Sequence, residues 1–213
     1  SSFKPDASVS KRAALQYPCL SHWLYNTEND RAVAHIRHRG LDRAEGHVKV
    51  IFVPCYLNGI DGIFDQTYYD LLQGMDLTIY PSYYEPWGYT PLESLAFKVP
   101  TITTTLAGFG KWVNDFYPEK QKAIEVVTRT DSNYGDVVAA IVKNITDLLA
   151  ISNADLDKQR KQANEVSQIA LWKNLVQHYI KAYELTLENI EDRVEKLPFV
   201  QTDGLAYLEK MKV

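Results

Sequence analysis

Residues 77–105 read LTIYPSYYEPWGYTPLESLAFKVPTITTT, and they contain the clearest signals of fold class in the chain. Its first residues, Leu77–Tyr80, form a short apolar run that ends at a proline, which predicts a buried strand. Thr101–Thr105 is rich in β-branched residues and predicts a second strand. Between them, Thr90–Lys98 predicts a helix, because a proline is tolerated in the first turn of a helix. A strand, a crossover helix and a second strand form the unit from which parallel sheets are built.

The alternation of strands and helices continues on both sides of this stretch. Val48–Pro54 is a nearly continuous apolar run, which is typical of a strand buried on both faces. The other predicted elements are helices Ser8–Tyr17, Glu28–Arg39, Gln66–Gly74 and Gly110–Tyr117, strand Ala123–Val127, and helices Tyr134–Ala150, Ala154–Val166 and Ala170–Ile190. We therefore predict an α/β fold, in which a parallel sheet has helices on both faces and is followed by C-terminal helices.

Length and composition fit one α/β domain with helical appendages. The chain has 213 residues, 46% of them hydrophobic, and a net charge of −4. We predict a helical lead-in segment at residues 1–46, a sheet-forming core at 47–150, and helices with a tail at 151–213. No basic stripe indicates a nucleic-acid partner, and no apolar run reaches the ~20 residues of a membrane span. With only Cys19 and Cys55, and no export signal, we expect a cytoplasmic protein.

Polar residues gather in the turn that follows the predicted strand Leu77–Tyr80. Ligands of parallel sheets bind at this edge, outside the carboxyl ends of the strands. Gly88 allows the backbone to approach a ligand closely, and the helix start offers N–H groups and a positive dipole end to a phosphate. Glu85 and Glu93 have seven residues between them, and Glu93, one turn into the helix, can reach a sugar hydroxyl. These residues indicate an anion or nucleotide site, although a turn with structural duties alone would carry the same residue types.

The run YYEPWGYTPLE at residues 83–93 resembles the signature of the glycogen synthases of the animal and fungal type. These are retaining glycosyltransferases of the GT-B class, which carry a glutamate pair at this spacing. Other segments are similar to the same family: Pro18–Tyr25, Val48–Phe52, Asp76–Ser82, Pro100–Gly110 and Trp172–Tyr183. The resemblance covers roughly residues 15–190. It implies the Rossmann-like C-terminal domain of a GT-B enzyme, with residues 47–150 as its nucleotide-sugar-binding core.

The resemblance implies a role for each residue of the motif. Glu85 would be the catalytic residue beside the donor glucose, as nucleophile or as electrostatic stabiliser of the reacting sugar. The implied donor-binding residues are Tyr68, Trp87, Gly88, Tyr89, Thr90 and Glu93. Among them, the backbone of residues 88–90 and the Thr90 hydroxyl would hold the diphosphate, and Glu93 would hold the ribose. Tyr68 would stack on the uracil, with its neighbour Tyr69 as the rival for that role.

The implied reaction transfers glucose from UDP-glucose to the non-reducing end of an α-1,4-glucan with retention of configuration. The residues themselves do not distinguish UDP-glucose from ADP-glucose. No metal or other cofactor is implied, since main-chain donors can stabilise a diphosphate leaving group. The implied partners are the nucleotide sugar, the glycogen acceptor and an N-terminal Rossmann-like domain of the same enzyme, which no part of this sequence resembles. A homo-oligomer is left open, no nucleic acid or membrane is expected, and the chain alone is expected to be inactive.

Two departures from the family pattern and two alternatives bear on this interpretation. Pro54-Cys55-Tyr56 stands where the family usually has His-Pro-Glu. Asp155–Lys161 lacks the arginine-rich pattern with which eukaryotic members sense glucose 6-phosphate, which favours a bacterial member without that control. A non-catalytic nucleotide- or glucan-binding module is the main alternative, and the intact glutamate pair argues against it. A sucrose- or trehalose-type GT-B enzyme is a more distant alternative, because such enzymes usually carry a different flank around the motif.

Two further patterns have plain structural interpretations. His35 and His38 are three positions apart on a predicted helix, a spacing that can chelate a metal, but the neighbouring arginines disfavour a cation. Gly108–Lys111 resembles part of a phosphate-binding loop but lacks its full glycine pattern. We therefore interpret Gly108–Lys111 as a turn that enters a helix near the ligand.

Overall fold

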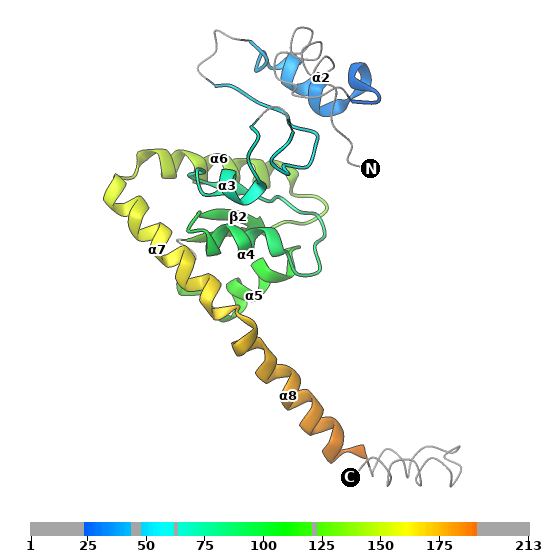
Figure 1. Ribbon diagram of the computed structural model, residues 1–213, viewed down its shortest axis with the longest axis vertical. Coiled ribbons are helices and arrows are strands. Elements are labelled where there is room, and N and C mark those ends of the chain that lie inside the picture. Colours follow the sequence, from blue (N-terminus) through cyan, green and yellow to red (C-terminus); the bar gives the residue numbers. More distant parts are fainter. Residues whose placement is uncertain (1–23, 44–47, 62–63, 121–122, 191–213) are drawn as a thin grey trace, which may run out of the picture. The chain divides into compact units, whose positions relative to one another are not determined.

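A computed structural model of the chain describes residues 24–43, 48–61, 64–120 and 123–190 (Figure 1). The chain divides into two compact units, Ser1–Thr78 and Ile79–Val213. Each unit is described below by itself. The predicted helix Ser8–Tyr17 and the tail from Lys196 lie outside the described residues.

The first unit contains a short helix pair and one further helix turn. The 3₁₀ helix η1 (Thr27–Asn29) leads into α2 (Arg31–His38), and the carboxylate of Asp30 caps α2 by accepting a hydrogen bond from the Val33 N–H at 3.0 Å. This cap sets the start of α2, so the predicted helix of this region is confirmed with a later first residue. The Val33 side chain is buried and packs against Leu24 and Phe52.

The helix α3 (Tyr68–Leu72) begins at a capping box, in which Thr67 and Asp70 exchange hydrogen bonds between side chain and backbone. Each of the two side chains satisfies a backbone N–H that the helix itself leaves without a partner. The predicted helix Gln66–Gly74 is therefore confirmed in shortened form.

The predicted strand Val48–Pro54 is wrong. The strands among the described residues are β1 (Thr78–Ile79), β2 (Thr101–Thr104) and β3 (Ile124–Val127). The side chains of Val48 and Ile51 are 64% and 62% exposed, so the apolar run does not lie between two layers. A strand is stabilised by hydrogen bonds to the strands beside it. A run of β-branched residues has a high strand propensity, but it does not determine whether another strand lies beside it.

The three strands form one open sheet in the order β1-β2-β3. The strands β2 and β3 are parallel, with Thr101 opposite Ile124 and Thr104 opposite Val127. The backbone N–H of Tyr80, just after β1, donates to the Ile102 carbonyl at 2.8 Å. All four residues of β2 are buried, as expected for a central strand covered on both faces.

Five α-helices of the second unit follow the predicted order. They are α4 (Tyr89–Ala96), α5 (Gly108–Phe116), α6 (Tyr134–Ala150), α7 (Asn153–Ile169) and α8 (Trp172–Glu188), with the 3₁₀ helix η2 (Pro118–Lys120) after α5. In Figure 1, α4 and α5 lie on one side of the strands and α6 lies on the other. The predicted α/β fold with a parallel sheet is therefore confirmed, and it is compatible with a Rossmann-like domain.

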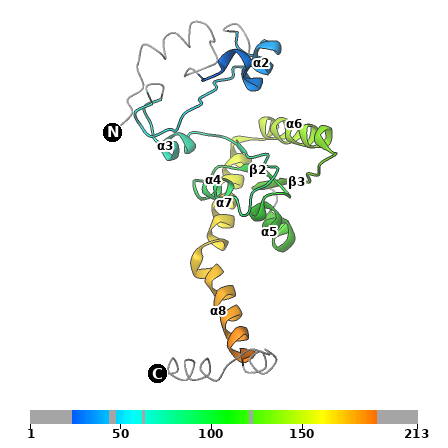
Figure 2. The ribbon, with the colours of Figure 1, turned by 90° about the vertical axis from the view of Figure 1, so that its right-hand side faces the viewer.

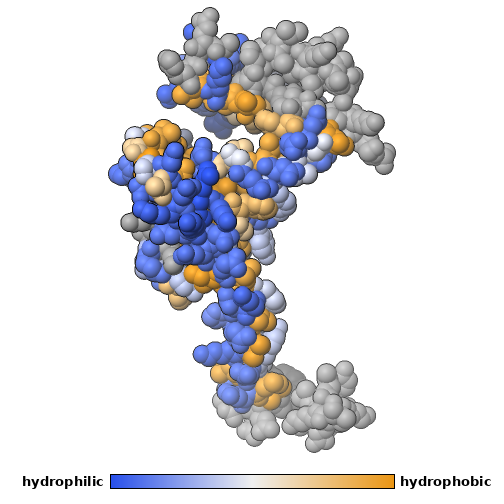
Figure 3. All heavy atoms as spheres, turned by 60° about the vertical axis from the view of Figure 1, so that its left-hand side comes forward, coloured by the Kyte–Doolittle hydropathy of each residue, from blue (hydrophilic) through white to orange (hydrophobic). Residues whose placement is uncertain are grey.

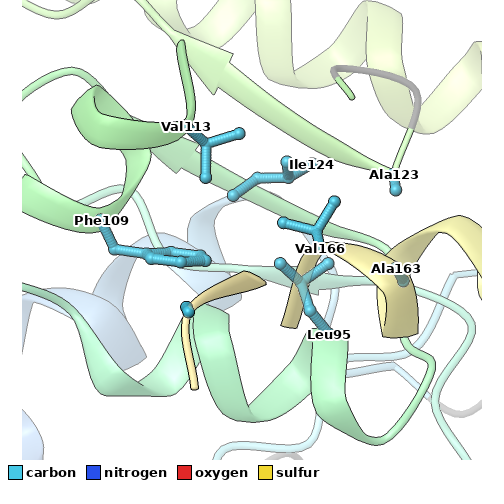
Figure 4. Packing of buried hydrophobic residues seen from close by; sticks show 8 residues of the cluster. Leu95, Phe109, Val113, Ala123, Ile124, Ala163 and Val166 are labelled. Carbon is cyan, nitrogen blue, oxygen red and sulfur yellow. The ribbon is translucent and has the colours of Figure 1, made fainter. Parts of the chain in front are cut away.

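The main core lies between the sheet and the helices α4, α5 and α7 (Figure 4). Leu95 on α4, Phe109 on α5, Ile124 on β3 and Val166 on α7 are each 0% exposed. The views in Figures 1 and 2 show α7 running along α4, where the Asn164 side-chain amide donates to the carbonyl of Ala96 at 3.0 Å. This packing fixes α4, and with it the turn that precedes α4.

No residue of α8 is buried. Its large apolar side chains lie open on the surface, where Figure 3 shows them among hydrophilic ones. They are Trp172, Tyr179, Ile180, Tyr183, Leu185 and Leu187. Within the described part of the chain, none of the helices has the length and apolar content that a membrane span requires.

Candidate functional site

The turn between β1 and α4 is fixed to the start of α5. Glu85 forms a parallel β-bridge with Ala107, in which the Glu85 N–H donates to the Leu106 carbonyl at 3.2 Å. The Glu85 carbonyl accepts from the Gly108 N–H at 3.0 Å, and the Trp87 carbonyl accepts from the Phe109 N–H. The motif of residues 83–93 therefore lies beside the carboxyl ends of β1 and β2, where parallel sheets bind their ligands.

Gly108 and Gly110 allow this close contact. A Cβ atom on Gly108 would lie 2.1 Å from the Pro86 carbonyl oxygen, a distance that no side chain tolerates. A Cβ atom on Gly110 would lie 2.6 Å from Thr103 Cγ2 and 2.8 Å from the Thr104 carbonyl oxygen. The first N–H groups of α5 are thus bonded to carbonyls of the turn, which supports a structural role for the Gly108–Lys111 pattern.

The start of α4 differs from that of α5 in the hydrogen bonding of its first N–H groups. Gly88 caps α4 with φ +101° and ψ 78°, a left-handed conformation that residues with a side chain rarely adopt. No side chain caps this helix, and among the described residues the N–H groups of Tyr89 and Thr90 have no hydrogen-bond acceptor. Pro91 lacks an N–H altogether. This end therefore combines a positive dipole end with donors that are open to a ligand.

The side chains around this turn differ in exposure. Glu85 and Glu93 are half-buried, whereas Tyr89 and Thr90 are exposed. The Trp87 ring packs into the core, with its centroid 5.6 Å from that of Phe109 and 5.7 Å from that of Trp112. The structure thus brings together Glu85, Gly88, Tyr89 and Thr90 at one turn, and Glu93 follows on the first turns of α4. Their roles in donor binding and catalysis stay predictions.

Tyr68 is the predicted site residue outside this turn. It begins α3 in the first unit and is half-buried, with its ring 5.4 Å from that of Tyr69. Tyr69 is 45% exposed. The stacking of either ring on a uracil stays a prediction.

Arg129, which no sequence motif pointed to, lies just beyond the carboxyl end of β3. Its side chain is only 7% exposed. The Nη1 donates to the Pro81 carbonyl at 2.6 Å, and the guanidinium carbon lies 3.5 Å from the centre of the Tyr83 ring. The position of Arg129 two residues after a buried strand was the signal that could have pointed to it.

Some side chains outside this turn have raised pKa values. Burial raises the pKa of the Cys55 thiol, and the negative charge of Asp61 adds to this rise. Hydrogen bonds to carboxylates raise the pKa of two exposed amines, Lys143 through Asp147 and Lys158 through Asp155. The residues that the structure describes contain no group of three histidine, cysteine or acidic side chains that could hold a metal ion. Catalysis without a metal stays a prediction.

Comparison with known proteins identifies the family. The model of the family described as glycogen synthase matches residues 7–202. The chain belongs to the glycogen synthase family. It is 32% identical to glycogen [starch] synthase isoform 1 of Saccharomyces cerevisiae over 174 residues, which cover 80% of this chain and 25% of that protein. It is 29% identical to the human liver glycogen [starch] synthase over 215 residues, which cover 96% of this chain and 31% of that protein.

The glycogen synthase resemblance predicted from the motif is thereby confirmed. A second yeast relative, isoform 2, is 31% identical over 206 residues, which cover 92% of this chain and 29% of that protein. The chain therefore spans about a quarter to a third of the length of these curated relatives. Such relatives do not favour the alternative of a non-catalytic binding module, and the bacterial origin stays a prediction.

Proposed function

We propose that the turn before α4 binds the diphosphate of a sugar nucleotide, as part of a glucosyltransferase that elongates glycogen. The observation that carries this proposal is the left-handed Gly88, which starts α4 without a side-chain cap. The N–H groups of Tyr89 and Thr90 are consequently open to a ligand at the ligand-binding edge of a parallel sheet. Membership of the glycogen synthase family supports a sugar nucleotide over other anions.

The two glutamates of the motif fit the sugar parts of such a donor. Glu93 lies on α4 beyond the proposed diphosphate position, where its carboxylate would accept hydrogen bonds from ribose hydroxyls. The half-buried Glu85 lies on the preceding turn, where it would face the donor glucose. Its negative charge would stabilise the positive charge that develops on the sugar ring as the bond to the diphosphate breaks.

The proposed reaction transfers glucose from UDP-glucose to the non-reducing end of an α-1,4-glucan with retention. The bond between the anomeric carbon and the diphosphate oxygen breaks, and the acceptor hydroxyl forms its bond on the same face of the sugar. The proton of that hydroxyl passes to the leaving phosphate. The N–H groups at the start of α4 would stabilise the charge on the diphosphate, so this proposal requires no metal. Glu85 acting as a nucleophile is the alternative route, with a covalent intermediate.

The acceptor and a second domain complete the proposal. We infer that a further Rossmann-like domain of the same enzyme contacts the glucan, because the chain covers only part of its relatives. The site would then form between the two domains, as GT-B enzymes place it. A cytoplasmic location follows from the nature of the substrates, and self-association of the enzyme is compatible with this arrangement.

Calorimetric titration of the 213-residue chain with UDP, ADP and UDP-glucose tests the binding proposal. We expect saturable binding of UDP and UDP-glucose, and we expect the Glu93→Ala variant to raise the Kd for UDP about tenfold. A hydrogen bond to a charged group contributes ~1.5–3 kcal/mol, and a tenfold change corresponds to about 1.4 kcal/mol. The matched control is Glu188→Ala, which removes an exposed carboxylate at the end of α8. The absence of binding, or equal affinity of the Glu93→Ala variant and the control, would contradict the proposal.

A further inference from the structure

Arg129 is buried, and it has no acidic partner among the described residues. Its side chain is 7% exposed, yet the ion pairs among the described residues do not include it. Its Nε is buried without a hydrogen-bond acceptor in the described part of the chain. A buried charge is costly unless hydrogen bonds or other charges compensate for it. The groups that contact this guanidinium therefore indicate the role of Arg129 in the structure.

The Arg129 guanidinium contacts Pro81, just before the motif, and Tyr83, the first residue of the motif. The Nη1 donates to the Pro81 carbonyl at 2.6 Å, and the guanidinium lies over the Tyr83 ring with 3.5 Å between its carbon and the ring centre. Cations are attracted to the negative face of an aromatic ring, and the attraction grows when both groups leave water. Tyr83 itself is 54% exposed, so the guanidinium holds one face of a ring that water would otherwise surround.

The backbone around Arg129 is anchored to the sheet. The Arg129 N–H donates to the Thr105 Oγ1 at 3.0 Å, and the Thr105 N–H donates to the Val127 carbonyl at 3.0 Å. The strand β2 also contacts the segment before the motif, because the Thr104 hydroxyl donates to the Ser82 carbonyl at 2.7 Å. Thr104 at the end of β2 and Arg129 after β3 thus bind the carbonyls of Ser82 and Pro81, and Arg129 also contacts the Tyr83 ring.

We propose that Arg129 is a positioning residue for the sugar-nucleotide turn, acting through Tyr83 and Pro81. By holding these two residues, it keeps Glu85 and Gly88 in the arrangement that binds the donor. This inference rests on the proposed function for its consequence, namely donor affinity. The restraint on the turn does not depend on that function. A neutral donor could hold the Pro81 carbonyl, but the guanidinium adds a planar positive charge that stacks on the ring.

Amide hydrogen exchange and UDP titration of variants of the 213-residue chain test this role. The variants are Arg129→Gln, Arg129→Lys, Tyr83→Leu and Tyr83→Phe, and the control is Lys143→Gln, which removes a positive charge from the exposed face of α6. We expect Arg129→Gln and Tyr83→Leu each to raise the Kd for UDP about tenfold, and to speed the exchange of the Glu85 and Gly108 amides. We expect Tyr83→Phe and the control to behave as the wild type, and Arg129→Lys to lie between.

The double variant Arg129→Gln with Tyr83→Leu separates one shared contact from two independent effects. We expect it to raise the Kd little more than either single variant, since both remove the same interaction. Tyr83 is largely exposed, so its replacement keeps the fold even where Arg129→Gln proves less stable.

The outcomes separate this inference from the proposed function. An Arg129→Gln variant with a lower Tm but an unchanged Kd and unchanged exchange at Glu85 and Gly108 would overturn the positioning role. If the wild type binds no nucleotide, the proposed function fails and the exchange rates still decide the inference. In that case, faster exchange at these two amides supports it, and unchanged rates overturn it.

Discussion

The Gly108→Ala variant is expected to lose about 3 kcal/mol of its free energy of unfolding. The new methyl group would lie 2.1 Å from the Pro86 oxygen and 3.0 Å from the Pro86 carbonyl carbon. Both are backbone atoms, which cannot move aside as a flexible side chain would. The start of α5 and the motif turn must therefore separate, which breaks the bonds between Gly108 N–H and the Glu85 carbonyl and between Phe109 N–H and the Trp87 carbonyl. Urea unfolding followed by circular dichroism measures this loss.

Gly135 provides the matched control for this substitution. It lies in the first turn of α6, and a Cβ atom there would have no heavy atom within 4 Å apart from its chain neighbours and the nearby backbone of its own helix. The Gly135→Ala variant is expected to gain ~0.5–1 kcal/mol, because alanine loses less conformational entropy than glycine when a helix forms. Equal unfolding midpoints for the two variants would show that the close approach of α5 to the turn is not a constraint.

The Glu85→Gln variant is expected to lower glucose transfer at least about a hundredfold in an active protein that contains this segment. Glutamine keeps the shape of the side chain and removes the negative charge that would stabilise the reacting sugar. Because that charge acts mainly in the transition state, the Kd for UDP should change little while kcat falls. Transfer of radiolabelled glucose to glycogen measures kcat. A Glu188→Gln control should retain full activity, and full activity of Glu85→Gln would remove Glu85 from the mechanism.

The sequence predicted the second unit well because its elements carry local signals. The bounds of α6, Tyr134–Ala150, agree with the apolar spacing of its sequence, and β2 and β3 differ from their predicted bounds by one residue. These elements are amphipathic or buried runs with clear breakers, which are properties of the nearest neighbours in sequence. The Val48–Pro54 run has a similar local signal but is not a strand, because strand formation also requires a partner that the run does not specify.

In the candidate site, too, the residues that carry a local sequence signal were predicted, and those that depend on contacts between distant parts of the sequence were not. Gly88 was predicted from the motif, and its left-handed conformation supplies the physical reason for a glycine at that position. Arg129 was not predicted, because it contacts the Pro81 carbonyl across 48 positions of sequence. Gly108 was predicted to lie in a turn that enters a helix, and the structure shows in addition that it makes room for the Pro86 backbone. Only the fold brings such pairs together.

The proposed function depends on main-chain N–H groups at the start of α4 that bind the diphosphate. A ¹⁵N-labelled sample of the chain titrated with UDP reports on each of these N–H groups by NMR. We expect large, saturable shifts at Gly88, Tyr89 and Thr90 that share one Kd, with Gly135 unchanged. Binding of UDP that leaves these three amides unmoved, with shifts elsewhere in the chain, would contradict it.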